Sequence, residues 1–159
     1  MSDTEGLEPL LRVLVAVDGS GPSMRASRFV TENLARFSEV LAINVSPIPV
    51  PYHPVVGWGI VRPWAATADV AQTAEVIESR SEQLRSEGDR VIDDAPIEPD
   101  ERIVEIGDST ERVLEAARDH HVGVIVLGAS DGGPLHRLLH GSTTSELLRT
   151  HEFPVLVVP

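Results

Sequence analysis

Two short segments near the C-terminal end of the chain contain the residue types that bind phosphate. Gly128 ends an apolar run, and a glycine at such a point lets a ligand approach the backbone closely. Residues 141–144 (GSTT) then supply three hydroxyl groups where a new helix is expected to begin. Because the first N–H groups of a helix are unpaired and favour anions, the two segments together predict a phosphate site. An ordinary strand-to-loop turn with a helix cap would use the same residue types, so this alternative stays open.

Asp18 ends a second apolar run, residues 11–17. Its carboxylate can accept hydrogen bonds from the hydroxyls of a ribose, or it can cap the turn and helix that follow. The position alone does not decide between these roles. No side chain is a clear general base for activating water, so we expect a binding site rather than an enzyme.

Apolar runs alternate with helical patterns along the chain. The expected strands are residues 11–17, 40–45, 102–106, 122–127 and 154–158. The expected helices are residues 22–37, 68–94, with a possible break at Gly88, 110–119, and one within 141–149. Ser20 or Ser23 should cap the first helix, and Asp108 or Ser109 the third. This alternation predicts an α/β fold: a parallel, doubly wound sheet with helices on both faces, in a single domain. Ligands of such sheets bind at the carboxyl ends of the strands, where Asp18 and Gly128 are expected.

Composition excludes several classes of function. The net charge is −12, with 25 acidic residues against 13 basic ones, all of them Arg, which argues against binding to nucleic acid. There is no Cys, so neither a disulfide framework nor thiol chemistry is expected. The acidic N-terminal residues do not resemble a secretion signal, and no apolar run is long enough to span a membrane. We therefore expect a cytoplasmic protein with no membrane contact.

Residues 46–64 form a proline-rich insertion in which regular structure is not expected. This insertion also contains every Tyr and Trp of the chain, namely Tyr52, Trp58 and Trp64. If exposed, these aromatic side chains would form a lid over the site or a surface for a partner. Alternatively, the insertion is a loop that packs on the edge of its own sheet and buries them.

Three segments resemble the universal stress protein family, and specifically its nucleotide-binding branch: residues 15–20 (VAVDGS), 104–130 (VEIGDSTERVLEAARDHHVGVIVLGAS) and 138–159 (LLHGSTTSELLRTHEFPVLVVP). That branch carries the motif Gly-x2-Gly-x9-Gly-Ser/Thr. Gly128, Gly141 and Ser142 match it at the right spacing, whereas Asp131 replaces the second glycine. An Asp there either repels the phosphates or helps to ligate a cation between them.

The resemblance implies a five-stranded sheet of strand order 3-2-1-4-5 and a bound adenine nucleotide, most simply ATP, with Mg2+ or Mn2+. Adenine would pack near Ala16 and Val17 with backbone contacts at Val45, and Asp18 would hold the ribose. The implied phosphate contacts, with the loop residues near them, are Gly128, Ser130, Asp131, Gly141, Ser142, Thr143 and Thr144. It also implies a stress-related regulatory homodimer joined through its C-terminal strand, with a protein partner still unknown. The alternative is a dimeric interaction module of the same fold that has lost nucleotide binding and acts through protein partners.

Other α/β classes fit the residues less well. A response-regulator receiver needs a Lys, which the chain lacks, and a Rossmann dehydrogenase needs Gly-x-Gly-x-x-Gly after the first strand. His136 and His140 are four residues apart but have no obvious third ligand, so no protein-bound metal is expected.

Overall fold

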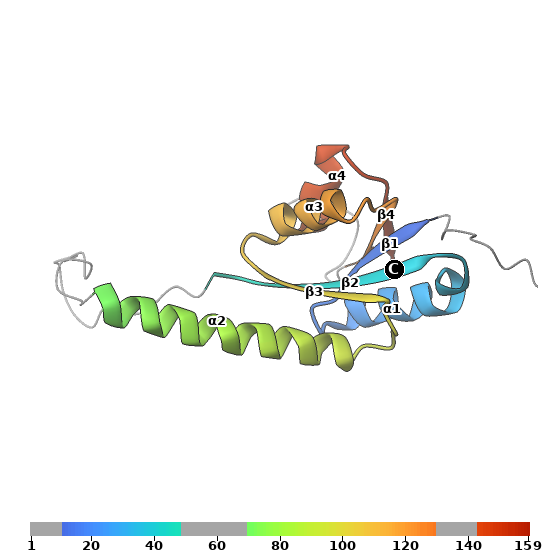
Figure 1. The fold of residues 1–159 in the computed structure, drawn as a ribbon. Coiled ribbons are helices and arrows are strands. Elements are labelled where there is room, and N and C mark those ends of the chain that lie inside the picture. Colours follow the sequence, from blue (N-terminus) through green and yellow to red (C-terminus); the bar gives the residue numbers. More distant parts are fainter. Residues whose placement is uncertain (1–10, 49–69, 130–142) are drawn as a thin grey trace, which may run out of the picture.

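A five-stranded, all-parallel sheet forms the centre of the molecule (Figure 1). The computed structural model describes residues 11–48, 70–129 and 143–159. The strands are β1 (Arg12–Ala16), β2 (Glu39–Ser46), β3 (Glu101–Ile106), β4 (Val124–Gly128) and β5 (Val155–Val158). Their spatial order is β3-β2-β1-β4-β5, which confirms the expected order 3-2-1-4-5. The sequence order reverses direction at β1 and β4, so the ends of these two strands are where a ligand of such a sheet binds.

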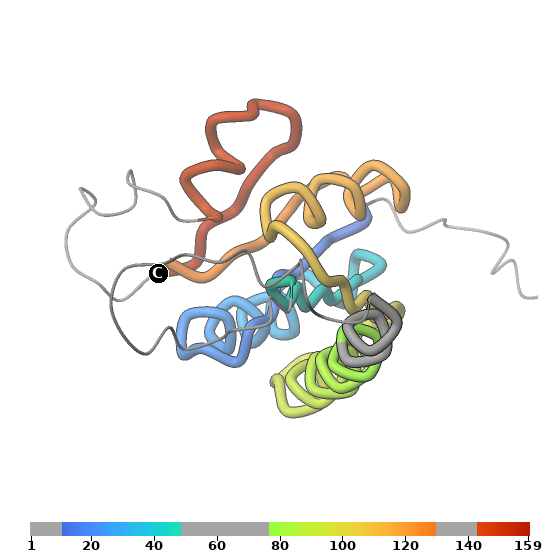
Figure 2. The backbone as a smooth tube through the Cα atoms, turned by 90° about the vertical axis from the view of Figure 1, so that its left-hand side faces the viewer, coloured from blue at the N-terminus to red at the C-terminus, as the bar shows by residue number. Residues whose placement is uncertain are grey.

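Helices cover both faces of the sheet, as predicted (Figure 2). α1 (Gly21–Asn33) and α2 (Val70–Asp93) pack on one face, and α3 (Ser109–Asp119) and α4 (Thr143–Thr150) lie on the other. The central strands are apolar on both sides because side chains alternate along a strand. In β1, for example, Val13 and Val15 are buried with α1 and α2, whereas Leu14 is buried with α3 and α4.

The first helix is shorter than the sequence predicts. Ser20 is its N-cap and accepts a hydrogen bond from the N–H of Ser23 at 3.3 Å, and Pro22 occupies the first turn, where no N–H is needed. α1 ends at Asn33, and residues Ala35–Phe37 form a separate 3-10 turn. The predicted helix over residues 22–37 was therefore wrong at its C-terminal end. A tighter 3-10 turn commonly closes a helix that lacks a glycine stop.

The long helix α2 runs without interruption through Gly88, although the sequence suggested a break there. Gly88 is buried against the sheet, and packing rather than flexibility explains it. A Cβ at this position would lie 2.6 Å from Cγ1 of Val104. The other end of α2 extends past the sheet (Figure 1), and Ile77 is 38% exposed.

The proline-rich insertion lies mostly outside the described residues. Ser46 belongs to β2, so the insertion begins later than the sequence suggested, and Tyr52, Trp58 and Trp64 all lie outside the described part of the chain. Within the described ranges, no helix is long and apolar enough to cross a membrane. The same ranges contain no cluster of three or more acidic or His side chains arranged to hold a metal ion.

Candidate functional site

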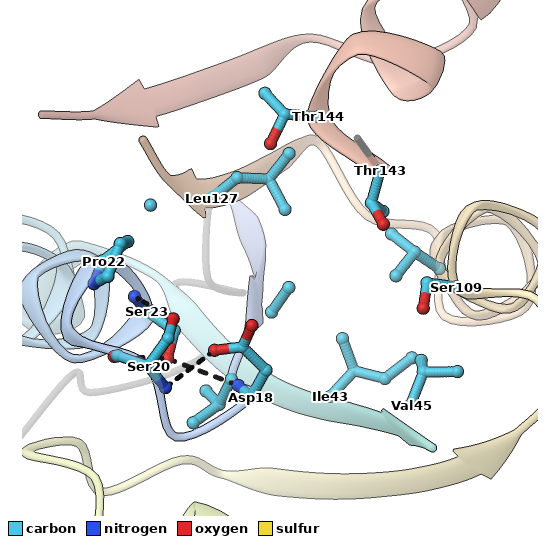
Figure 3. A pocket seen from close by; sticks show the side chains of 14 residues that line it. Asp18, Ser20, Pro22, Ser23, Ile43, Val45, Ser109, Leu127, Thr143 and Thr144 are labelled. Atoms are coloured by element: carbon cyan, nitrogen blue, oxygen red, sulfur yellow. Dashed lines mark hydrogen bonds between the residues drawn. The ribbon is translucent and has the colours of Figure 1, made fainter. Parts of the chain in front are cut away.

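A pocket opens at the carboxyl edge of the sheet, between the ends of β1, β2 and β4 and the first turns of α1, α3 and α4 (Figure 3). The described residues around it enclose about 130 Å³. The lining residues are Ala16, Val17, Asp18, Ser20, Pro22, Ser23, Ile43, Val45, Ser109, Val113, Leu127, Gly128, Thr143 and Thr144. The pocket lies at the switch point of the strand order, where the fold predicts a ligand site.

One side of the pocket is apolar. Ile43 and Val45 come from β2, Leu127 from β4 and Val113 from α3. Ile43 and Val45 are two residues apart, so their side chains point to the same face of the sheet, which is the face that α3 covers. A flat apolar group can pack on this side without losing hydrogen bonds to water.

Asp18 lies in the turn that leads from β1 into α1. One carboxylate oxygen, Oδ1, accepts a hydrogen bond from the N–H of Ser20 at 2.9 Å. The other carboxylate oxygen points into the pocket (Figure 3). The backbone N–H of Asp18 donates to Oγ of Ser23 at 3.3 Å. The carboxylate therefore supports the turn with one oxygen and presents the other to the pocket, so the two roles open at the sequence level are compatible.

The surroundings of Asp18 keep its carboxylate ionised. Partial burial raises the pKa of the carboxyl, but hydrogen bonds from Ser20 and Ser23 lower it by more, so the pKa lies below the usual value for Asp. A negative charge at the pocket rim is thus present at all physiological pH values.

We expect Ser20→Ala to raise the pKa of Asp18, because the hydroxyl of Ser20 lowers this pKa in addition to the backbone N–H, which alanine keeps. A carboxyl with a lowered pKa stabilises the fold above its unfolded pKa, about 4, and this contribution is lost as the pH falls through the folded pKa. The wild-type protein should therefore lose more stability below about pH 4 than the variant does. Loss of the helix cap should cost about 1 kcal/mol at neutral pH. Carbon-13 NMR titration of the carboxyl and urea unfolding at pH 7 and pH 3 measure both effects, and an unchanged pKa would contradict the assignment.

The wall facing Asp18 carries hydroxyl groups from two helix starts. Thr143 and Thr144 belong to the first turn of α4, and Ser109 opens α3. The side chains of Thr143 and Ser109 lie on the same side of the pocket (Figure 3). The first N–H groups of a helix are unpaired within it, so this wall offers N–H groups as well as hydroxyls to an anion.

Gly128 lines the pocket through its backbone, but its lack of a side chain serves α1. A Cβ on Gly128 would lie 2.1 Å from the carbonyl oxygen of Pro22 and 2.2 Å from its carbonyl carbon. The sequence analysis explained this glycine by the close approach of a ligand. In the structure, a side chain here would point into the close contact between the end of β4 and the first turn of α1, and this contact requires the glycine.

The structure places seven of the eleven predicted site residues in this one pocket: Ala16, Val17, Asp18, Val45, Gly128, Thr143 and Thr144. The other four, Ser130, Asp131, Gly141 and Ser142, lie outside the described residues. Seven lining residues were not predicted: Ser20, Pro22, Ser23, Ile43, Ser109, Val113 and Leu127. A strand's period of two would have found Ile43 from Val45, and the expected cap of the third helix would have found Ser109.

A parallel, doubly wound sheet with a pocket of this kind at its switch point defines a class of ligand-binding α/β proteins. Residues 10–159 match the model of the universal stress protein family, and the chain belongs to that family.

Individual relatives agree with this membership. The chain is 26% identical over 161 residues to the stress response protein NhaX of Bacillus subtilis, covering 92% of this chain and 96% of that protein. The fold is similar to that of a universal stress protein from Burkholderia pseudomallei, with a TM-score of 0.54 and 21% identity over 96% of this chain and 98% of that one. It is also similar to a universal stress protein solved in complex with cAMP, with a TM-score of 0.55 and 17% identity over 94% and 96% of the two chains.

Proposed function

We propose that this protein is a stress-related regulatory protein that binds an adenine nucleotide, ATP above all, in the pocket at the carboxyl edge of β1 and β4. One observation carries the proposal: a single pocket combines an apolar wall, an ionised carboxylate and the hydroxyl-bearing start of a helix. These are the surfaces that a base, a ribose and a phosphate require in turn. Membership of the universal stress protein family and the cAMP complex of a similarly folded protein support the same ligand class.

The base would pack against the apolar wall formed by Ile43, Val45 and Val113. The ribose hydroxyls would donate to the oxygen of Asp18 that faces the pocket, since a charge-assisted hydrogen bond is stronger than a neutral one. The phosphates would lie toward Thr143 and Thr144 and toward residues 130–142, which contain the other predicted phosphate contacts. A volume of about 130 Å³ is below the ~300–1,000 Å³ of a typical small-molecule site, so the described residues would hold only part of the nucleotide.

A divalent cation completes the charge balance of this proposal. Asp18 is the one charged side chain among the fourteen described residues that line the pocket, and its charge is negative. ATP itself carries several negative charges, and Asp131 adds another within the motif. Mg2+ or Mn2+ bound between the phosphates, with Asp131 as a candidate ligand, would offset this repulsion.

We further propose that the protein binds its nucleotide without catalysing a reaction and works as a homodimer. Asp18 is a poor general base, because its pKa is low and one of its oxygens is held by Ser20.

The homodimer is argued from the edge of the sheet. β5 forms one edge, and three of its four residues are only half-buried. An apolar edge strand favours pairing with a second copy of the chain. Sedimentation of the protein as a monomer at micromolar concentration would contradict the dimer.

Asp131 favours a second candidate function. If this residue prevents phosphate binding, the protein is a dimeric interaction module whose partner contacts Tyr52, Trp58 and Trp64. The two functions differ in one measurable property, which is affinity for ATP.

Isothermal titration of the purified protein with ATP, with and without Mg2+, tests the proposal. We expect binding in the micromolar range that Mg2+ strengthens. We also expect Asp131→Gly to bind ATP more tightly than the wild type in the absence of Mg2+, because it removes a negative charge beside the phosphates. The variant should respond less to Mg2+. Absence of heat at millimolar ATP in both proteins would overturn nucleotide binding and favour the interaction module.

A further inference from the structure

Asn44 is a polar side chain buried between the sheet and α2. It is 6% exposed and follows Ile43 in β2, so its side chain points to the face of the sheet opposite to that of Ile43. Its Nδ2 donates to the backbone carbonyl of Val17 at 2.8 Å. Its Oδ1 has no hydrogen-bond partner among the described residues. Half of a buried amide is thus unsatisfied, which is unfavourable for stability and calls for an explanation.

The bond from Asn44 acts where β1 ends. β1 stops at Ala16, and Val17 is the last residue before Asp18. The N–H of Val17 donates to the carbonyl of Ile43 at 2.8 Å, and the carbonyl of Val17 accepts from Asn44. Both polar groups of Val17 are therefore held by β2. This arrangement fixes the plane of the peptide bond that joins Val17 to Asp18.

α2 supports the same turn from behind. A Cβ on Gly88 would lie 2.7 Å from Oδ1 of Asn44, so only a glycine lets the helix come this close. One turn further on, Val91 lies next to Gly19, where a Cβ would be 3.5 Å from its Cγ1. Gly19 has φ of +80°, a conformation that suits glycine. Asn44 and Val91 thus contact the segment around Asp18 on either side of that residue.

We propose that Asn44 is a positioning residue: its hydrogen bond to the Val17 carbonyl orients the following turn so that the Asp18 carboxylate faces the pocket. This inference rests on the proposed function, since Asp18 is the residue that would hold the ribose. A leucine of similar size would fill the space without an unsatisfied oxygen. The amide at this position is therefore explained by the hydrogen bond that orients the Val17 carbonyl, rather than by a gain in stability.

The experiment combines Asn44→Leu and Asp18→Ala, singly and together, in titrations with ATP and 2′-deoxy-ATP. We expect Asn44→Leu to weaken ATP binding about tenfold and to reduce the preference for ATP over its 2′-deoxy form. In the Asp18→Ala background, Asn44→Leu should cause no further loss, because it acts through Asp18. The matched control is Asn33→Leu, at the chain's other asparagine, whose Nδ2 donates to the carbonyl of Phe29 on the surface of α1. This control should bind like the wild type.

Losses that multiply in the double variant, or unchanged affinity in a folded Asn44→Leu protein, would overturn the inference. If Asn44→Leu does not fold, Gly88→Ala replaces it, because the added methyl group displaces the Asn44 amide from the helix side. A wild-type protein that binds no ATP would overturn the proposed function separately. The carboxyl carbon-13 resonance of Asp18 then decides the positioning role without a ligand. It should shift in Asn44→Leu and stay in place in Asn33→Leu, and a resonance unmoved by Asn44→Leu would overturn the role.

Discussion

Gly128→Ala should lower the free energy of unfolding by about 3 kcal/mol or more, the upper end of the range for overpacked sites. The new Cβ would lie 2.1 Å from the carbonyl oxygen of Pro22. This atom belongs to the backbone at the start of α1, so it cannot rotate away as the end of a side chain can. The first turn of α1 and the end of β4 must separate, which would also disturb the Asp18 turn. Urea unfolding measures the loss of stability.

The matched control is Gly123→Ala, directly before the first residue of the same strand. There the new Cβ would meet Cδ1 of Leu11 at 2.5 Å, which is the end of a flexible side chain that is 37% exposed. Leu11 can move aside, so we expect a cost below about 1 kcal/mol. Equal stability of the two variants would show that β4 and α1 are not in such close contact.

Asp18→Ala should weaken ATP binding by about 10- to 100-fold, the value of one charge-assisted hydrogen bond of about 1.5–3 kcal/mol. The loss should be smaller for 2′-deoxy-ATP, which lacks one of the hydroxyls that the carboxylate would accept. Asp18→Asn keeps an oxygen for the N–H of Ser20 but loses the charge. Its affinity for ATP should therefore lie between those of the wild type and Asp18→Ala.

The control for the charge itself is Asp100→Asn. Asp100 accepts a hydrogen bond from the N–H of Val40 at 2.8 Å, where β2 begins, at the opposite edge of the sheet from the pocket. This variant should bind ATP like the wild type. Tighter binding of ATP by Asp18→Ala than by the wild type would mean that Asp18 repels the phosphates more strongly than it binds the ribose hydroxyls. The proposed role of Asp18 would then be wrong.

Local patterns predict most of this fold. The strands are short apolar runs, and the caps Ser20 and Asp108 are neighbours of the helices they begin. The strand order, by contrast, came from the resemblance to a known family, since a periodic pattern does not say which strands are adjacent. Helix ends were less predictable, because the 3-10 turn after Asn33 has no strong sequence signal.

The parts of the site that could not be predicted depend on contacts between distant residues. The contact of Gly128 with Pro22 joins residues 106 positions apart, and the bond from Asn44 to Val17 joins residues 27 positions apart. A single sequence shows that a glycine or an asparagine is present, but not which neighbour explains it. The sequence alone therefore assigned Gly128 to a ligand and gave no reason for the asparagine at position 44.

The length of α2 has a mechanical consequence. At 1.5 Å per residue, the start of the helix at Val70 is about 27 Å from Gly88, the point where the helix contacts Asn44. A tilt of the helix about Gly88, which lies behind the Asp18 turn, therefore moves its two ends by different distances. A tilt of about 10° at Gly88 would carry Val70 through roughly 5 Å, since displacement grows with distance along the rigid axis. The same tilt would move Asp93, only five residues beyond Gly88, by roughly 1.3 Å, so a small movement at the C-terminal end of α2 becomes about 3.6 times larger at Val70.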